Sequence, residues 1–229
     1  MNGFLSSEII INQNEELQSA SAKIITKNLA LNQNLIGDFD FSLSGSPIYK
    51  TYKISTSVIN GGKKNILGLG NVFIVDKNIN LDVDFNLDDF DLSFLSSFGK
   101  NKVNRIHGIV SGNLNLWGSL SDIKLKGKTT INKGNLYLPI TNTEYKIRDK
   151  TPIFFQDQSI RFINTELLDS YEKTVATANG NLFHKNFKDW GIDLDVTSKR
   201  LLLFNKTKNL ESRFYGKGFL NGKASFKGP

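Results

Sequence analysis

The chain has 229 residues, a formal net charge of +7 and no cysteine. The lack of cysteine excludes disulfides, thiolate metal sites and a cysteine nucleophile. The positive charge comes from single lysines spaced along strand-like segments, such as Lys124, Lys126 and Lys128. Because clustered arginines are missing, we expect a solvated sheet face and no nucleic-acid partner.

Apolar and polar residues alternate through most of the chain. The alternating runs, in chain order, are residues 39–43, 52–58, 81–87, 123–125, 136–140 and 190–196. Side chains on a strand point to opposite faces in turn, so each run predicts a strand with one apolar face. Turn signals at residues 37–38, 45–47, 60–62, 76–78, 119–122, 133–134, 186–189 and 221–222 predict up-and-down hairpins between such strands.

One helix interrupts this predicted series of strands. Asp88 or Asp89 is a suitable N-cap, the apolar residues Leu92 and Leu95 follow at helical spacing, and Gly99 is a suitable stop. We therefore expect a short helix over residues 89–99. It separates an N-terminal part of the sheet, residues 1–88, from a second part of the same continuous sheet, residues 100–229.

The predicted fold is all-β: an elongated, curled, mainly antiparallel sheet that forms a trough. No helices are predicted to cover its apolar face, so the sheet must either close on itself or shelter something apolar. Glycines at inward positions also argue against a tightly filled core. The residues expected to line the shared concave face are Leu81, Val83, Phe85, Leu87, Val110, Leu114, Leu116, Ile123, Leu125, Leu136, Leu138, Ile192, Leu194 and Val196.

No residue pattern predicts an enzyme, a metal site or a cofactor. The two histidines, His107 and His184, stand apart from other ligand-type residues, and we expect both at the surface or in loops. A row of aspartates at positions 82, 84, 88, 89 and 91 lacks the residue order of a calcium loop. We expect this row to be a solvated strand face.

A glycine-punctuated series of short strands is the nearest approach to a motif. It comprises Gly112-x-Leu-x-Leu-x-Gly118, then Ser-Leu-Ser-Asp-Ile-Lys-Leu-Lys-Gly127, Asn-Lys-Gly134-Asn-Leu-Tyr-Leu-Pro139, Phe214-Tyr-Gly216-x-Gly218 and Phe226-Lys-Gly-Pro229. From about residue 80 onward, this series resembles the C-terminal domain of the TamB family, in the form found in Bacteroidetes-like bacteria. TamB is the inner-membrane component of the translocation and assembly module.

The resemblance implies a fold and a task. TamB and its AsmA-like relatives are bridge-like lipid transfer proteins with a taco-shaped β-trough. They reach across the periplasm from an inner-membrane anchor toward an outer-membrane barrel of the Omp85 class. We thus expect a periplasmic piece of a longer protein, attached to the inner membrane through parts absent from this chain, with phospholipid acyl chains as its ligand.

Two functions stay open at this point. The first is a non-enzymatic trough that conducts phospholipid between the inner and outer membranes, or assists assembly of outer-membrane proteins. The alternative is a structural β-solenoid or adhesin-type interaction module without lipid transport. A solenoid requires a fixed repeat length, and the strand spacing here is uneven.

Overall fold

The structure, a computed structural model, describes residues 2–13, 18–31, 34–97, 104–208 and 215–228. It is all-β and antiparallel, which confirms the predicted fold class. The strands are β1 (Asn2–Gln13), β2 (Gln18–Leu31), β3 (Asn34–Ser46), β4 (Thr51–Asn60), β5 (Lys63–Val75), β6 (Asn78–Asp91), β7 (Asn104–Ser119), β8 (Asp122–Leu138), β9 (Thr143–Ile147), β10 (Thr151–Asp157), β11 (Ser159–Asp169), β12 (Val175–Lys185), β13 (Lys188–Lys206) and β14 (Gly216–Gly228).

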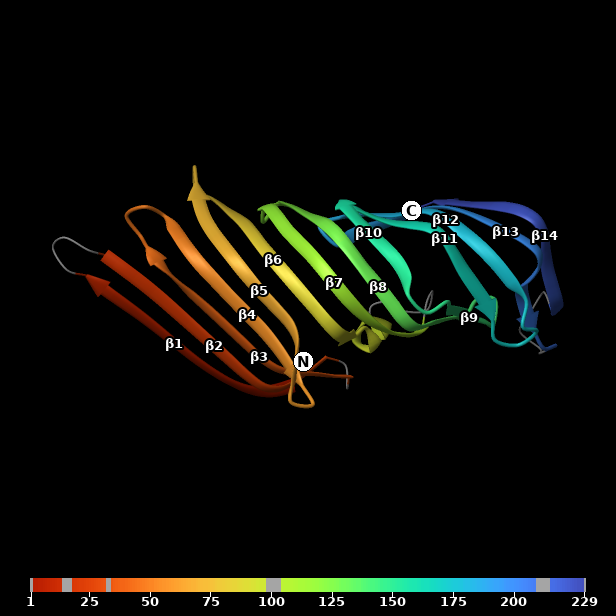
Figure 1. Cartoon of the computed structure of the whole chain (residues 1–229), viewed down its shortest axis with the longest axis horizontal. Coiled ribbons are helices and arrows are strands. Elements are labelled where there is room, and N and C mark those ends of the chain that lie inside the picture. The colour runs from red at the N-terminus through yellow and green to blue at the C-terminus, as the bar shows by residue number, and fades with distance from the viewer. Residues whose placement is uncertain (1, 14–17, 32–33, 98–103, 209–214, 229) are drawn as a thin grey trace. The chain divides into compact units, whose positions relative to one another are not determined.

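The strands follow one another in the sheet in the order of the sequence, as hairpin connections dictate (Figure 1). The one departure lies between β8 and β11. There β9 pairs with both of these strands, and β10 also lies between them. Two short strands therefore occupy the place of one long strand.

The chain forms two compact units. Unit 1 comprises Met1–Phe90, Ser111–Thr129 and Phe155–Gln158, and unit 2 comprises Asp91–Val110, Thr130–Phe154 and Ser159–Pro229. The units therefore divide β7 and β8 between them. This division differs from the predicted one at residues 89–99, because the chain returns to unit 1 after that segment.

The predicted helix is shorter than expected and begins later. Strand β6 continues through Asp88 and Asp89 to Asp91, and a single 3₁₀ helix, η1, spans Ser93–Ser97. Its cap is Asp91, whose Oδ1 accepts hydrogen bonds from the Ser93 backbone N–H at 2.8 Å and from the Ser93 hydroxyl at 2.5 Å. The N-cap prediction at Asp88 or Asp89 is therefore wrong, and Phe98 and Gly99 lie outside the described residues.

Three of the predicted turns lie inside strands. Residues 37–38 belong to β3, residues 133–134 to β8 and residues 221–222 to β14. At each of these places one residue has a positive φ: 129° at Gly37, 52° at Lys133 and 116° at Gly222. Such residues distort the strand without reversing it, and so the sequence signal for a turn marks an irregular strand position instead.

Polar side chains support several of these distortions in the same way. In four cases, the backbone N–H of a strand residue with a positive φ donates a hydrogen bond to a side chain. The accepting side chain belongs to a later strand or turn. The pairs are Asn28 with Asp38 Oδ1 at 2.9 Å, Asp89 with Ser111 Oγ at 3.0 Å, Lys133 with Asp149 Oδ1 at 2.6 Å and Asn164 with Asn179 Oδ1 at 2.8 Å. We call these four contacts the bulge contacts.

Candidate functional site

Unit 1 has one continuous apolar sheet face, which we call the open face. Strand pairing puts Phe85 opposite Gly68, Gly68 opposite Thr56, and Thr56 opposite Phe41. Directly paired residues share a face, so this row and its neighbours lie on one side of the sheet. The apolar residues of β2 to β6 on this face are Ala20, Ala22, Ile24, Phe39, Phe41, Leu43, Tyr52, Ile54, Val58, Ile66, Val72, Ile74, Ile79, Leu81, Val83, Phe85 and Leu87.

Strands β7 and β8 extend the open face. The Asn115 amide donates to Asp82 Oδ1 at 2.8 Å and to Asp84 Oδ1 at 2.9 Å, which puts the odd-numbered residues of β7 on the polar side. Leu114 and Leu116 therefore lie with Val83 on the apolar side. A Cβ on Gly127 would lie 3.1 Å from the Leu114 side chain, so Gly127 of β8 lies on the same side of the sheet as Leu114. Leu125 and Ile123 share its parity.

No helix covers the open face within the described part of unit 1, which contains only strands and turns. Several of its residues are nevertheless shielded by their neighbours in the sheet: Val83 is 2% exposed and Val58 is 7% exposed. The face becomes fully accessible at β1, where Ile9 is 74% exposed. Among these strands the site is thus an apolar face that no helix covers, mostly half-buried over β2 to β6 and exposed at β1.

Two glycines of β5 shape the middle of the open face. A Cβ on Gly68 would lie 2.6 Å from the Phe85 ring, and a Cβ on Gly70 would lie 2.1 Å from the backbone oxygen of Asp82. The Phe85 ring therefore lies over Gly68, in space that any other residue would fill. The space beside this inward glycine is therefore filled, whereas the sequence pattern predicts that inward glycines mark a loosely filled core.

The opposite face of β6 and β7 is polar and explains the row of aspartates. Besides the Asn115 contacts with Asp82 and Asp84, the Asn86 amide donates to Asn113 at 3.0 Å. A hollow of about 740 Å³ lies here, lined by side chains that include Leu67, Leu69 and Lys126.

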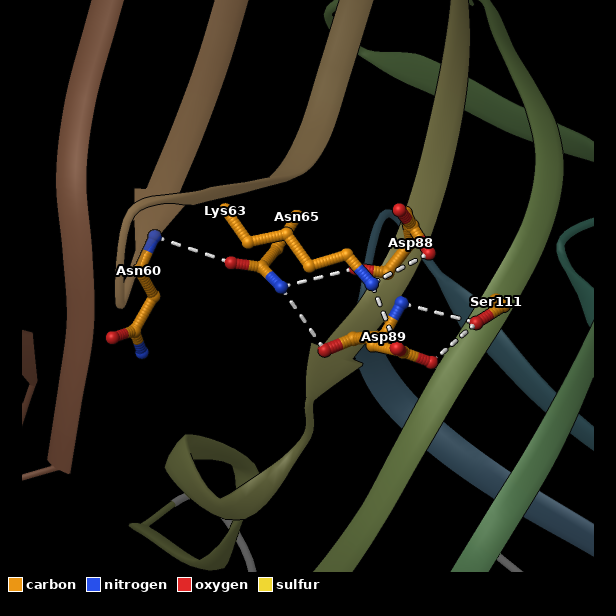
Figure 2. A network of polar contacts seen from close by, with 6 residues as sticks. All are labelled: Asn60, Lys63, Asn65, Asp88, Asp89 and Ser111. Carbon is orange, nitrogen blue, oxygen red and sulfur yellow. Dashed lines mark hydrogen bonds and ion pairs between the residues drawn. The ribbon is translucent and has the colours of Figure 1, made fainter.

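The remaining two aspartates of β6 in unit 1 belong to a polar network at the end of the strand (Figure 2). Lys63 Nζ lies 3.0 Å from Asp88 Oδ1 and 2.7 Å from Asp89 Oδ2. Asn65 is 8% exposed, accepts the Asn60 N–H at 3.1 Å and donates to the backbone oxygens of Asp88 and Asp89 at 3.0 and 3.2 Å. These carboxylates therefore hold the irregular end of β6.

Unit 2 places its predicted lining residues differently. Val196 is 6% exposed and belongs to a packed cluster with Tyr145, Ala176, Ala178 and Leu201. Leu136 and Leu138 pack against this cluster. Ile192 and Leu194 share a face with Val196 but lie nearer the start of β13, half-buried. Val110, the predicted lining residue of β7 in this unit, is buried as well.

Two hydrogen bonds link β13 to β9 and to the turn before β9, beside the packed cluster of unit 2. The Tyr145 hydroxyl donates to the backbone oxygen of Leu202 at 2.6 Å, and the Asn205 N–H donates to the Thr141 oxygen at 2.9 Å. Leu202 has no exposed surface. Val196 thus belongs to a packed core, which we call the sealed core, and the half-buried Leu136 and Leu138 lie against it, whereas the predicted residues of unit 1 lie on a face that no helix of the described part of that unit covers. That any of them contacts lipid stays a prediction.

The two histidines lie in different surroundings. His107 is exposed, as predicted, and its Nδ1 lies 3.0 Å from the Ser93 hydroxyl. His184 is only 5% exposed, so the prediction of a surface position is wrong for this residue. Its ring stacks on Phe187 at a centroid distance of 4.6 Å and lies 4.9 Å from the Trp190 ring. Burial lowers the pKa of His184. The aromatic residues that follow it in the sequence are the signal that could have revealed this contact.

Within the residues that the structure describes, no group of three or more His, Cys, Asp or Glu side chains is arranged to hold a metal ion. None of the helices described is long and apolar enough to cross a membrane. Comparison of the chain with protein families, with curated proteins and with solved structures gives no match.

Proposed function

We propose that this chain is a non-enzymatic part of a TamB-like lipid-transfer protein of the cell envelope. Its open face would shelter phospholipid acyl chains while the headgroups remain in water. The observation that supports this proposal most strongly is the uncovered apolar surface of unit 1, which continues over β2 to β8. An apolar sheet face of this extent without a covering layer is a candidate site for an apolar ligand or partner.

The energetics of acyl-chain binding suit this surface. Each methylene removed from water contributes about 0.8 kcal/mol, so an acyl chain is held by area alone and needs no specific polar contact. Movement along the face then requires only that neighbouring positions be similarly apolar. Aliphatic and aromatic side chains repeat from strand to strand across unit 1, which meets this requirement.

The cellular setting is part of the proposal. By the resemblance of the second part of the sequence to the TamB family, the chain would act in the periplasm, tethered to the inner membrane. Its protein partner would be an outer-membrane barrel of the Omp85 class.

Site-specific photocrosslinking tests lipid contact on the open face. Phe85 lies on that face, whereas Phe73 of β5 pairs with Asn80 and Thr51 and lies on the opposite face. Replacing each phenylalanine in turn with benzoylphenylalanine gives two probes of the same size and chemistry. After incubation with phospholipid vesicles and irradiation, mass spectrometry should find lipid adducts at Phe85 and few at Phe73. Equal labelling at both positions, or none at either, contradicts the proposal.

The alternative function, a structural or adhesin-type module, has its own support in the sealed core of unit 2. A protein that needs only a rigid scaffold would bury its apolar residues in this way. It predicts that the purified chain contains no bound phospholipid after expression, which lipid extraction and mass spectrometry would reveal.

A further inference from the structure

The turn between β12 and β13 exposes an unusual set of aromatic side chains. We call residues 183–190 the aromatic turn. Phe183 is 44% exposed, Phe187 is 44% exposed and Trp190 is 45% exposed. Single exposed apolar residues are ordinary on protein surfaces, but the rings of Phe187 and Trp190 both contact the His184 ring and so form a two-ring patch that calls for a partner.

The aromatic turn is internally ordered. The buried His184 ring contacts the rings of Phe187 and Trp190, and His184 Nδ1 accepts the Phe187 N–H at 3.2 Å. The Trp190 indole N–H donates to the Phe187 backbone oxygen at 3.1 Å. The one polar atom of the indole is therefore satisfied within the turn. Because of this, the ring can enter an apolar medium without leaving a bare donor.

The backbone conformation of the turn is unfavourable for Phe187. Asn186 and Phe187 connect the paired residues Lys185 and Lys188, and both have positive φ values, 49° and 60°. Two-residue hairpin turns of this kind favour Asn followed by Gly. The second position is occupied by phenylalanine instead, which keeps a large ring at the tip of the hairpin.

Positive charge flanks the aromatic rings. Lys185 and Lys188 lie directly opposite each other in the ladder, a like-charge arrangement that destabilises a hairpin. Both are exposed, and no ion pair links either lysine to another residue in the described part of the chain. The turn itself contains one acidic residue, Asp189. An anionic surface in front of the turn would relieve this repulsion.

We propose that the aromatic turn inserts into the interface of a bilayer that contains anionic phospholipid. Aromatic side chains with an apolar body favour the headgroup level of a membrane, and lysines beside them reach the phosphates. A protein groove would require a matching shape, whereas the bilayer interface accepts the two rings and two ammonium groups without one. This inference is independent of the proposed function, because it involves the surface of unit 2 and not the open face of unit 1.

The two tryptophans of the chain provide the test. Trp190 belongs to the aromatic turn, and Trp117 lies in unit 1 with Lys124 Nζ 4.9 Å from its ring centroid. Trp117→Phe leaves Trp190 as the sole tryptophan, and Trp190→Phe leaves Trp117 as the control. With vesicles of phosphatidylcholine and phosphatidylglycerol, Trp190 emission should shift to the blue and be quenched by brominated lipid, while Trp117 emission stays unchanged.

Phe187→Gly separates folding from membrane binding. Glycine suits the left-handed position, so the hairpin should fold at least as well, but co-flotation with the anionic vesicles should be lost. Lys185→Gln and Lys188→Gln should each weaken vesicle binding roughly fivefold. The inference is overturned if Phe187→Gly floats as the parent chain does, or if Trp190 keeps its aqueous emission. If the parent chain binds pure phosphatidylcholine vesicles as strongly as the anionic vesicles, the proposed role of the lysine charges is overturned.

Discussion

At the scale of the residue, His184 shows how one side chain organises the end of a hairpin. Its Nδ1 accepts a backbone N–H at 3.2 Å, so this nitrogen must be unprotonated and the proton of the neutral ring is on Nε2. Burial also lowers the pKa of the imidazole, because the ring is shielded from the water that would stabilise its charged form. The neutral ring is therefore a requirement of the folded turn.

The aromatic turn should accordingly lose stability in acid. In the unfolded chain the His184 imidazole binds a proton below about pH 6.5, whereas in the folded turn its pKa is lower. The neutral His184 ring therefore contributes fully to the stability of the folded turn above that pH. This contribution is lost as the pH falls through the lowered pKa of the folded state. Amide hydrogen exchange at Phe187, corrected for the intrinsic pH dependence, should speed up in that window.

Two variants check the assignment to His184. His184→Gln should remove the corrected pH dependence at Phe187, because the titrating ring is gone. His107→Gln, which alters the exposed second histidine, should leave it intact. If the acid effect persists in His184→Gln, another group is responsible for it.

At the scale of the element, the bulge contacts recur in both units and explain why irregular strands remain paired. Each distortion frees one backbone N–H, and an unsatisfied amide in a sheet costs about 1–3 kcal/mol when it is buried. A neighbouring carboxylate, amide or hydroxyl oxygen accepts it instead. In none of the four bulge contacts is the residue with the positive φ a glycine; in one contact it is Lys133.

Asn179→Ala tests one bulge contact. Removing the acceptor of the Asn164 N–H should lower the free energy of unfolding by about 1 kcal/mol and speed hydrogen exchange at Asn164. The matched control is Asn181→Ala, on the same strand and the same face, whose Oδ1 lies 3.5 Å from the Ser159 hydroxyl and contacts no backbone N–H. Urea titration of both variants should show the larger loss for Asn179→Ala. Equal losses would contradict the proposed role.

The same contacts explain which elements could be predicted from the sequence. Alternation is a local property, so it identified the strands and the face to which each side chain points. A turn signal at residues 133–134 is also local, but whether the chain reverses there depends on partners elsewhere, such as Asp149. The helix start was misplaced for the same reason. Asp88 and Asp89 are suitable caps in isolation, yet Lys63 and Asn65 of β5 hold them in a strand.

At the scale of the whole molecule, the two units bury their apolar faces to different extents. The parity of Val83 and Val196 predicts apolar faces in both units, and strand pairing puts Leu81, Val83, Phe85 and Leu87 on one face of β6, and Ile192, Leu194 and Val196 on one face of β13. Parity does not show whether a face is covered. That depends on contacts such as the Tyr145 hydrogen bond to Leu202, which joins residues far apart in the sequence. A sealed core and an open face therefore look alike in the sequence.

A charged residue should distinguish the two faces. Leu201→Asp would bury an unpaired carboxylate within the packed cluster of Val196, at a position that is 2% exposed, at a cost of about 3 kcal/mol or more. Leu116→Asp would place the same group on the open face, where Leu116 is half-buried and water can reach the carboxylate. There the cost should be about 1 kcal/mol, the partial loss of an apolar contact. Hydrogen exchange should show lost protection in β9, β12 and β13, whose residues form the cluster, for Leu201→Asp, and near-normal protection in unit 1 for Leu116→Asp.

The folded Leu116→Asp variant then tests function at the same position. A hydrated carboxylate on the open face would interrupt the apolar path, so acyl chains that slide from strand to strand should stop there. With benzoylphenylalanine at Phe85, lipid labelling should fall when Leu116→Asp is added, while the circular dichroism spectrum stays that of a β-sheet. If Leu116→Asp unfolds unit 1 instead, this face is a closed core like that of unit 2, and the structural module becomes the better account of the chain.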